Sequence, residues 1–413
     1  MNSESRKVLV LGAGVAGLTT ALEIARCGIR VEVIEKKPFT GGHAVQFSCK
    51  ADDACVSCGA CIAEDTLKAA RSHPLIRMTS NSRLAGISRS SRLVAAIQYG
   101  PQYIAAEKCT RCGLCIQECP QPGAISPGFS GSDPPFISEA CLYVTNQSCT
   151  RCQDICPSAA INLQHRSERQ QLETDAIVIA TGFDPFNPID KPYGYGRFSD
   201  VVTSLDLERM LKRQGAVRRP SDGAFPRKIA FVQCVGSRDV KCGHPWCSQV
   251  CCASALRTAL LINKKQPGTQ ISFFYIDIQT FGSNFQSTYR ELPRQIDLVR
   301  AIPGDITASE DNRLRLIFFD TRSRRQLEET YDLVVLSVGI QPGRDAAALA
   351  EWFHLDLAET GFFPRQEQKQ PNAGSGIFVA GTACGPMNIQ ETAAHAARTA
   401  WNTVRFLNGD DNA

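Results

Sequence analysis

The chain has 413 residues, of which 43% are hydrophobic and 21% are charged, as in a globular protein of two or three domains. Its net charge of +4 is too small to indicate nucleic-acid binding, and no apolar run approaches the roughly 20 residues of a membrane helix. The N-terminus leads straight into a predicted strand without a cleavable apolar region, so we expect a cytoplasmic protein. In that compartment, 19 cysteines favour metal binding over disulfides.

The first predicted elements form a dinucleotide-binding unit. An apolar strand at 7–11 is followed by Gly12-Ala13-Gly14-Val15-Ala16-Gly17, then by a helix and a second strand at 31–34. The first glycine allows a tight turn, the second lets the backbone approach a pyrophosphate, and the third lets the helix pack against the sheet. Glu35 ends the second strand, where an acid bonds a ribose hydroxyl. The Gly41-Gly42 pair that follows favours FAD over NAD.

Four cysteines come soon after this glycine pair, so we expect them near the flavin. Cys49, Cys55, Cys58 and Cys61 are spaced x5, x2 and x2. Three interpretations stay open: a further [4Fe–4S] cluster, a redox-active Cys-x-x-Cys pair, or thiols that are partly structural. Two isolated cysteines, Cys27 and Cys384, are expected to be packing residues.

A ferredoxin-like insert is predicted at 106–168. The run Cys109-x2-Cys112-x2-Cys115-x3-Cys119-Pro120 is typical of ferredoxins, in which the last cysteine binds a second cube. A shorter run follows, Cys149-x2-Cys152-x3-Cys156-Pro157, and Cys141 can supply its missing ligand. If the two runs cross over, Cys156 completes the first cube and Cys119 the second. The alternative is a single cluster with a vestigial second site.

A second α/β unit is predicted at 226–340, bounded by apolar strands at 228–232 and 333–337. A pyridine-nucleotide domain carries a glycine loop after its first strand. Here the glycine pattern is absent, and the sequence has a predicted helix at 254–261 preceded by a Cys-Cys pair. We expect the four cysteines of this region to bind a [4Fe–4S] cluster in place of NAD(P)H: Cys234, Cys247, Cys251 and Cys252. The alternative is a set of buried thiols.

The chain returns to the flavin domain twice, through an apolar strand at 176–180 and again at 376–381, before a closing helix at 391–407. The flavin domain is therefore expected to comprise 1–105, 169–225 and 341–413. The predicted FAD-binding residues are Gly12, Gly14, Ala16, Gly17, Glu35, Lys36, Gly41, Gly42, His43, Ala180, Thr181, Gly182, Gly381, Thr382, Gln390, Glu391 and Thr392. The predicted fold class is α/β, a thioredoxin-reductase-like flavoprotein with two dinucleotide-binding domains and the inserted ferredoxin-like domain.

Three segments carry a resemblance to a known family: 231–239, with Cys234; 247–252, with the Cys-Cys pair; and 376–381. Through them the chain resembles the A subunit of heterodisulfide reductases, especially the branch that forms the A subunit of the quinone-interacting membrane-bound oxidoreductase complex. The resemblance implies FAD, a [4Fe–4S] cluster on the Cys234 set, and partner subunits that carry out the terminal chemistry. The segment 54–61 has more cysteines than the usual family version, so a cluster there is inferred from spacing alone.

These patterns predict an oxidoreductase subunit that relays electrons between FAD, [4Fe–4S] clusters and partner subunits. Three clusters are expected, with the Cys49–Cys61 set as a candidate fourth. Any membrane contact is expected only through partner subunits, and no catalytic residue is assigned. One alternative is an NAD(P)H-dependent disulfide reductase of the thioredoxin reductase type, although the missing second glycine loop argues against it. The other is a scaffold whose clusters only stabilise the fold.

Overall fold

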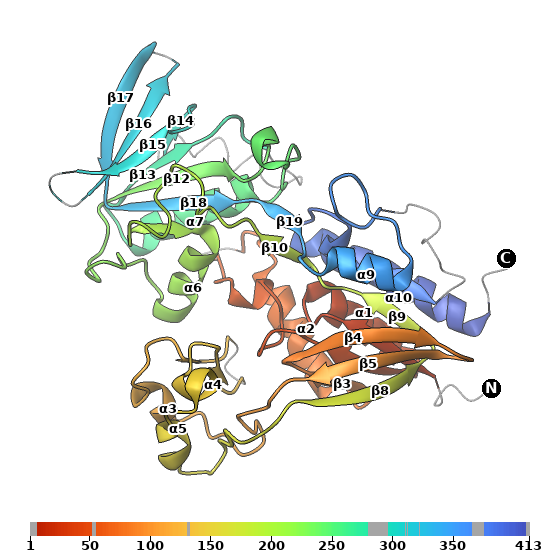
Figure 1. Ribbon diagram of the computed structural model, residues 1–413. Coiled ribbons are helices and arrows are strands. Elements are labelled where there is room, and N and C mark those ends of the chain that lie inside the picture. Colours follow the sequence, from red (N-terminus) through yellow and green to blue (C-terminus); the bar gives the residue numbers. More distant parts are fainter. Residues whose placement is uncertain are drawn as a thin grey trace.

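The computed structural model describes residues 6–51, 55–129, 133–279, 296–309, 311, 313–321, 323–365 and 376–409. Two α/β units lie side by side, and the cysteine-rich insert lies beside both of them (Figure 1). The two strand connections between the units, β10 (Phe183–Pro185) and β19 (Ile340–Pro342), pair with each other in an antiparallel ribbon.

The first unit is built on a parallel sheet of five strands in the order β20-β9-β1-β2-β3. The bounds are β1 (Lys7–Leu11), β2 (Arg30–Ile34), β3 (Ile76–Thr79), β9 (Ala176–Ile179) and β20 (Ile377–Val379). The central strands are almost entirely apolar because both faces of the sheet are covered. The carboxyl ends of such strands form the edge where α/β sheets bind ligands.

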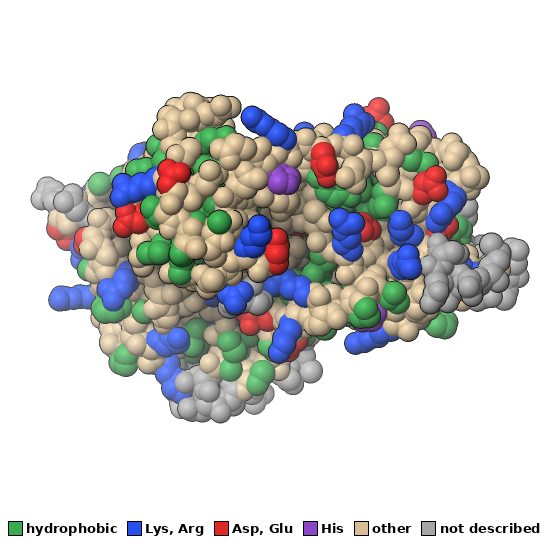
Figure 2. Space-filling model, turned by 90° about the horizontal axis from the view of Figure 1, so that it is seen from below, with side chains coloured by type: hydrophobic (Ala, Val, Ile, Leu, Met, Phe, Trp, Pro, Cys, Tyr) green, Lys and Arg blue, Asp and Glu red, His purple; other side chains and the backbone are tan. Residues whose placement is uncertain are grey.

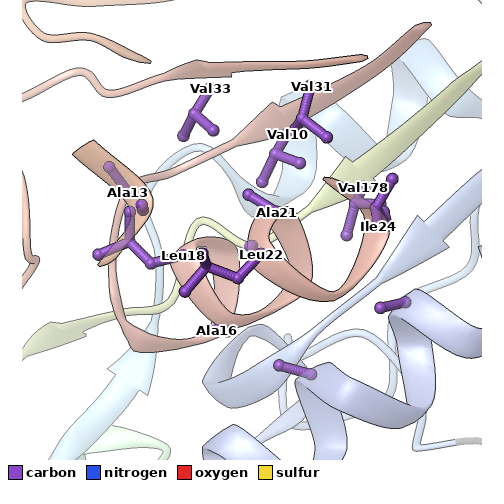
Figure 3. Packing of buried hydrophobic residues seen from close by; sticks show 14 of the residues in the cluster. Val10, Ala13, Ala16, Leu18, Ala21, Leu22, Ile24, Val31, Val33 and Val178 are labelled. Carbon is purple, nitrogen blue, oxygen red and sulfur yellow. The ribbon is translucent and has the colours of Figure 1, made fainter. Parts of the chain in front are cut away.

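Helices cover one face of this sheet and an antiparallel sheet covers the other. On the first face α1 (Val15–Arg26) packs between the strands and α10 (Ile389–Asn408), as the buried side chains in Figure 3 show. On the second face lie β4 (Ser82–Arg89), β5 (Leu93–Tyr99) and β8 (Glu168–Thr174), together with α9 (Ala346–Phe353). The flavin-type unit is therefore a three-layer structure assembled from distant parts of the chain.

The insert leaves and returns at one end of the β5–β8 pair. These strands pair from Leu93–Thr174 to Tyr99–Glu168, so the intervening chain departs and re-enters at adjacent points. The segments that enter and leave the insert are joined by a hydrogen bond from Ala105 N to Ala160 O at 2.8 Å. Because the framework closes without it, the insert can form its own small core. Its elements are α3 (Leu114–Gln117), β6 (Ile125–Ser126), β7 (Phe136–Ile137), α4 (Leu142–Asn146) and α5 (Arg151–Asp154).

The second unit repeats the parallel architecture, with the strand order β11-β18-β12-β13-β14. These strands are β11 (Val201–Thr203), β12 (Lys228–Val235), β13 (Gln270–Phe274), β14 (Asp297–Val299) and β18 (Leu333–Val338). One face carries α6 (Ser204–Gln214) and α7 (Cys251–Lys265). The other carries β15 (Asp305–Ala308), β16 (Leu314–Asp320) and β17 (Arg325–Tyr331).

The boundary expected near residue 225 needs a correction. The sequence pattern places residues 169–225 in the flavin domain, but β11 pairs in parallel with β18, and Leu207 of α6 is buried in the core of the second unit. The second unit therefore begins near residue 200. A short strand and an amphipathic helix give no sequence signal of which sheet they join.

The surface carries side chains of both charges, in keeping with the small net charge of the chain. Figure 2 shows basic and acidic side chains interspersed over the face seen from below. Among the helices of the described residues, none is both long and apolar enough to cross a membrane.

Candidate functional site

A cavity of about 450 Å³ opens at the carboxyl ends of the first sheet, between the two units. The flavin-type unit contributes the β1–α1 turn, the end of β2, segments at 42–47 and 180–184, and the start of α10. Its wall also includes Ser57, Cys58 and Ala60, where Ala60 begins α2 (Ala60–Ser72). The second unit contributes Glu208, residues of the 249–257 segment and Ile340. The site is therefore shared between units that are distant in sequence.

The three glycines of the first loop have different surroundings. A Cβ on Gly14 would meet nothing closer than Gly42 Cα at 3.9 Å, and both residues line the cavity. A Cβ on Gly17 would lie 1.8 Å from Gly12 O, and one on Gly12 would lie 2.4 Å from Ala180 O. Gly14 thus leaves open space for a ligand, whereas Gly12 and Gly17 allow close packing of backbone against backbone.

Glu35 is buried at the rim of the cavity and already holds the loop in place. Its carboxylate accepts hydrogen bonds from Ala13 N at 2.8 Å and from Lys37 N at 2.9 Å. A carboxylate has about four acceptor positions, so Glu35 can still accept a bond from a ligand hydroxyl. The residue therefore fits the predicted ribose contact and also stabilises the turn that bears Gly14.

His43 is neutral at the site. Burial, followed by the charge of Lys37, lowers its pKa to about 4. Its Nε2 lies 3.1 Å from the carbonyl oxygen of Phe183, which can only accept, so Nε2 carries the proton and Nδ1 is an acceptor. Within the described part of the chain this buried Nδ1 has no hydrogen-bond partner. An acceptor left over at such a site fits a hydroxyl-bearing ligand such as FAD.

The start of α10 closes one wall of the cavity. Asn388 caps the helix by accepting a bond from Glu391 N at 2.8 Å, and the Glu391 carboxylate accepts one from Asn388 N at 2.9 Å. Gln390 donates to Ser57 O at 3.0 Å, which joins the helix to the Cys55–Cys61 loop. The capping box fixes the N-terminus of a 20-residue helix at the cavity, where its positive end favours an anionic group.

Most of the predicted FAD-binding residues come together here. Those lining the cavity are Gly14, Ala16, Glu35, Lys36, Gly42, His43, Ala180, Thr181, Gly182, Thr382, Gln390, Glu391 and Thr392. Gly12, Gly17, Gly41 and Gly381 lie behind it, where a Cβ would meet neighbouring atoms at 2.6 Å or less. The sequence interpretation missed Phe183, Lys50, Glu208 and Arg257. Phe183 directly follows a predicted residue, but the other three give no sequence signal.

The third cysteine set lies against the same cavity. The sequence predicts a helix that starts after the Cys-Cys pair, but α7 begins at Cys251, so the pair occupies its first turn. The residues on either side of the pair, Gln249, Val250, Ala253 and Ser254, line the cavity. Cys234 stands at the end of β12 with φ +61°, where the register with β18 shifts between Val232 and Val235.

The electrostatics show that these four thiols are mutual neighbours. Burial, followed by nearby Cys252, raises the pKa of Cys234 to about 11, and Cys247 acts in the same direction. Burial and the proximity of Cys252, Cys234 and Cys247 also raise the pKa of Cys251. Cys242 lies outside the set, with its Sγ 3.5 Å from Asp239 O. Thiols held this close together fit a cluster, which binds thiolates and removes their protons.

The cysteines of the insert fall into two groups. Burial, then Cys109 and Cys112, raises the pKa of Cys115, and Cys156 adds to the shift; these four line one small cavity. Burial raises the pKa of Cys152 to about 11, followed by the influence of Cys141, Cys115 and Cys119. Cys149 lies just before α5 and is partly exposed. Cys156 thus lies with the first run, whereas Cys152 has Cys141, Cys115 and Cys119 as neighbours.

Within the described ranges, no group of three or more His, Cys, Asp or Glu side chains could hold a single metal ion as it stands. Thiolates around a [4Fe–4S] cube each bind a different iron atom, so they stand further apart than the ligands of one ion.

The remaining cysteines differ in exposure. Cys58 lines the flavin cavity, whereas Cys49, Cys55 and Cys61 are exposed. Burial raises the pKa of Cys384 to about 12, which agrees with a packing role. Cys27 follows the last turn of α1 and is exposed, so the packing prediction is wrong for this residue.

The fold and the first loop define the class of protein. Residues 7–49 match the family model described as an FAD binding domain. The whole fold is that of a thioredoxin-reductase-like flavoprotein with two dinucleotide-binding units. Thioredoxin reductase from Lactococcus lactis superposes over 98% of this chain and 100% of its own, with a TM-score of 0.56 and 14% identity. Thioredoxin reductase from T. acidophilum superposes over 99% and 100%, also with a TM-score of 0.56, at 11% identity.

More similar sequences come from heterodisulfide reductases. The A subunit of the H(2):CoB-CoM heterodisulfide,ferredoxin reductase from Methanothermobacter marburgensis is 31% identical over 95% of this chain and 63% of the relative. The A subunit of the ferredoxin:CoB-CoM heterodisulfide reductase from Methanosarcina mazei is 32% identical over 98% of this chain and 53% of its own. The iron-sulfur A subunit of the CoB--CoM heterodisulfide reductase from Methanocaldococcus jannaschii is 31% identical over 95% and 63%. The chain thus spans between half and two thirds of these relatives.

Proposed function

We propose that this protein is an electron-transfer subunit of a heterodisulfide-reductase-like oxidoreductase, with FAD and [4Fe–4S] clusters as its carriers. One observation carries the proposal: the segment around Cys251 and Cys252 forms part of the wall of the flavin cavity. A flavin and a cluster in these two sites would be neighbours. The relatives named as heterodisulfide reductase A subunits, one of them as an iron-sulfur subunit, support the same function.

The carriers divide the chemistry between them. When bound, FAD exchanges electrons in pairs or singly, and each [4Fe–4S] cluster exchanges one at a time. We assign the FAD to the cavity at the N-terminus of α10. We assign three clusters to the following ligand sets: Cys109, Cys112, Cys115 and Cys156; Cys119, Cys141, Cys149 and Cys152; and Cys234, Cys247, Cys251 and Cys252.

The protein holds these groups close together and adjusts their surroundings. Cys156 illustrates the adjustment, because burial raises its pKa but hydrogen bonds from Ala160 N and from Ser158 outweigh that effect and lower the pKa overall. Such bonds stabilise negative charge on a ligand sulfur and raise the potential of a cluster. The units are also held together by a buried ion pair between Lys50 and Glu208, with Nζ 2.6 Å from Oε2. A fixed spacing between carriers suits electron transfer.

The cysteine loop of the second unit argues against a pyridine-nucleotide site in residues 226–340. In a nucleotide site the first turn of the helix presents bare backbone NH groups to the phosphates. In this chain that turn carries Cys251 and Cys252 instead. We therefore expect electrons to arrive through partner subunits, as in a heterodisulfide-reductase-like or quinone-interacting complex, with any membrane contact made by those partners.

Anaerobic purification followed by redox titration tests the proposal. Dithionite is expected to bleach the FAD and to produce EPR signals from reduced clusters at accessible potentials. Micromolar NADH or NADPH is expected to leave the flavin absorbance unchanged. Rapid bleaching by either nucleotide would favour the NAD(P)H-dependent disulfide reductase instead. Clusters that do not cycle at all would favour a scaffold.

A further inference from the structure

The loop Cys55–Cys61 has the same sequence pattern and backbone conformation as the first loop of the ferredoxin insert. Both read Cys-x-x-Cys-Gly-x-Cys: 55, 58, 59 and 61 in one, and 109, 112, 113 and 115 in the other. The residue two positions after the first cysteine is left-handed in each, with φ +51° at Ser57 and +59° at Arg111. The glycines follow suit, with φ, ψ of +77°, +1° at Gly59 and +81°, −5° at Gly113.

The agreement continues into the helices. Gly59 is the N-cap of α2 and Gly113 is the N-cap of α3, so Cys61 and Cys115 are each the second residue of a helix. Left-handed conformations at non-glycine residues are uncommon and cost free energy, so the match at Ser57 and Arg111 is not a default of the chain. In the insert, the three cysteines of this loop line one small cavity at the start of a helix, which is what a cube requires.

A third cysteine loop repeats part of this arrangement. Gln249, two residues after Cys247, is left-handed with φ +65°, and its backbone NH donates to Cys247 Sγ at 3.3 Å. Likewise Ser57 N donates to Cys55 Sγ at 3.4 Å. A left-handed residue whose NH points at the preceding cysteine therefore occurs both in the 55–61 loop and in the proposed cluster site beside the cavity.

A fourth cysteine is available in the segment just before this loop. Cys49 stands beside Lys50, whose ammonium group is buried against Glu208 Oε2 at 2.6 Å and Ser48 O at 2.8 Å. These contacts fix the chain on both sides of Cys49, although Cys49 itself is exposed. The backbone NH of Ala51 also donates a hydrogen bond to Cys49 Sγ at 3.4 Å.

The loop lies at the edge of the flavin cavity. Cys58 lines that cavity, Gln390 of α10 donates to Ser57 O at 3.0 Å, and a Cβ on Gly59 would lie 3.0 Å from Ile389 Cβ. Arg257 of α7 lines the same cavity and is close enough to Cys58 to feel its charge. A half-buried cation of this kind would stabilise the negative charge of a thiolate-bound cluster.

We propose that Cys49, Cys55, Cys58 and Cys61 bind a further [4Fe–4S] cluster beside the FAD site. The proposal deepens the electron-transfer function and depends on it only for the role of the cluster, not for its presence. The cluster would stand between the flavin and solvent, because three of its four ligands are exposed. FAD would then adjoin two clusters held by different units, one on this loop and one on the first turn of α7.

Iron content of the full chain, purified anaerobically with its FAD, tests the proposal. Four cubes predict about 16 iron atoms and as many labile sulfides per chain, and Cys58→Ser is expected to leave about 12. Cys49→Ser and Cys61→Ser are expected to have the same effect. Cys27→Ser is the matched control, since Cys27 is also exposed but belongs to no cysteine set. An unchanged far-ultraviolet circular dichroism spectrum will show that each variant is folded.

Two comparison variants separate this proposal from the function it rests on. Cys112→Ser and Cys251→Ser are each expected to lose about four iron atoms. If these two lose iron but Cys58→Ser does not, the further cluster is absent and the proposed function stands. If none of the three loses iron, the proposed function fails as well.

Alkylation of the unaltered protein gives a second readout that needs no variant. Free exposed thiols react with iodoacetamide, whereas cluster ligands are protected until the cluster is removed by acid. We expect Cys27 to react at once and Cys49, Cys55 and Cys61 to react only after acid treatment. Labelling of those three at the rate of Cys27, or a disulfide between Cys55 and Cys58, overturns the proposal in favour of free thiols or a redox-active pair.

Discussion

The β1–α1 and β12–α7 connections occupy equivalent places in two similar sheets, yet they differ in length and in the side chains that they carry. The first is residues 12–14, a turn without side chains at its glycines, whose Gly14 faces open space. The second is residues 236–250, a long loop that delivers Cys247 and then the Cys251-Cys252 pair into the first turn of the helix. A phosphate needs backbone NH groups and no side chains, whereas a cluster needs thiolates. The first loop is thus suited to a nucleotide, and the second to the cluster that we propose.

The position of Cys234 reinforces this difference. In the first unit β1 pairs in continuous register with β2 from Lys7–Arg30 to Leu11–Ile34. In the second unit β12 loses its register with β18 after Val232, and Cys234 takes a left-handed conformation. The irregularity turns one thiol towards the start of α7. The end of β12 thus differs from the end of β1, as the loop that follows it differs from the β1–α1 turn.

Removing one cofactor at a time is the strongest test of the comparison between the two connections. Replacing Cys251 and Cys252 together by serine is expected to remove about four iron atoms while leaving FAD bound, because both residues belong to the second unit. Gly14→Val is expected to do the reverse, since its side chain would enter the cavity without a backbone clash. Iron and FAD assays on both variants check this. Loss of both cofactors in either variant would mean that the two sites do not function separately.

The contact between the units is expected to show the next largest effect. Glu208→Ala leaves the Lys50 ammonium buried without its partner, since the two side chains are only 7% and 4% exposed. Breaking such a pair from one side costs about 3–5 kcal/mol. Denaturant unfolding monitored by FAD release measures the loss. Lys212→Ala is the control, because its partner Glu64 is half exposed and such pairs contribute about 0–1 kcal/mol.

Glu35 tests the first loop alone. Glu35→Ala removes the acceptor for Ala13 N and Lys37 N, as well as the expected bond to the ribose of FAD. We expect FAD to bind more weakly by roughly 1.5–3 kcal/mol, the size of one charge-assisted hydrogen bond, a smaller loss than in Gly14→Val. Flavin titration of the apoprotein measures both. Full FAD affinity in Glu35→Ala would place the ribose elsewhere.

The smallest expected effect is the pH dependence contributed by His43. Its pKa is about 4 in the folded protein and 6.5 in a free chain, so the unfolded state binds a proton between these values that the native state does not. Stability must then fall as the pH drops through this window, by about 2 kcal/mol at pH 5. His43→Gln is expected to flatten the change between pH 7 and 5. His165→Gln, at an exposed position, is expected to keep the wild-type profile.

The local patterns of the sequence determined a large part of the protein. The apolar strand, the glycines at 12, 14 and 17 and Glu35 identified the dinucleotide-binding unit, because each residue type meets a steric or hydrogen-bonding need that few others meet. The cysteine spacings indicated the insert for the same reason, since a cube can be reached only from certain intervals. The positions of β9, β12 and β18 also followed from their apolar runs.

Tertiary structure alone decided how the parts meet. Nothing in the chain around Glu208 or Arg257 indicates that they wall a flavin cavity, because their contacts involve segments about 160 to 200 residues away. The assignment of β11 and α6 to the second sheet likewise depends on pairing with β18. The closeness of Cys58 and the Cys251-Cys252 segment to one cavity arises from the packing of two units. Local sequence encodes which loops can hold a cofactor, whereas long-range packing sets which cofactors become neighbours.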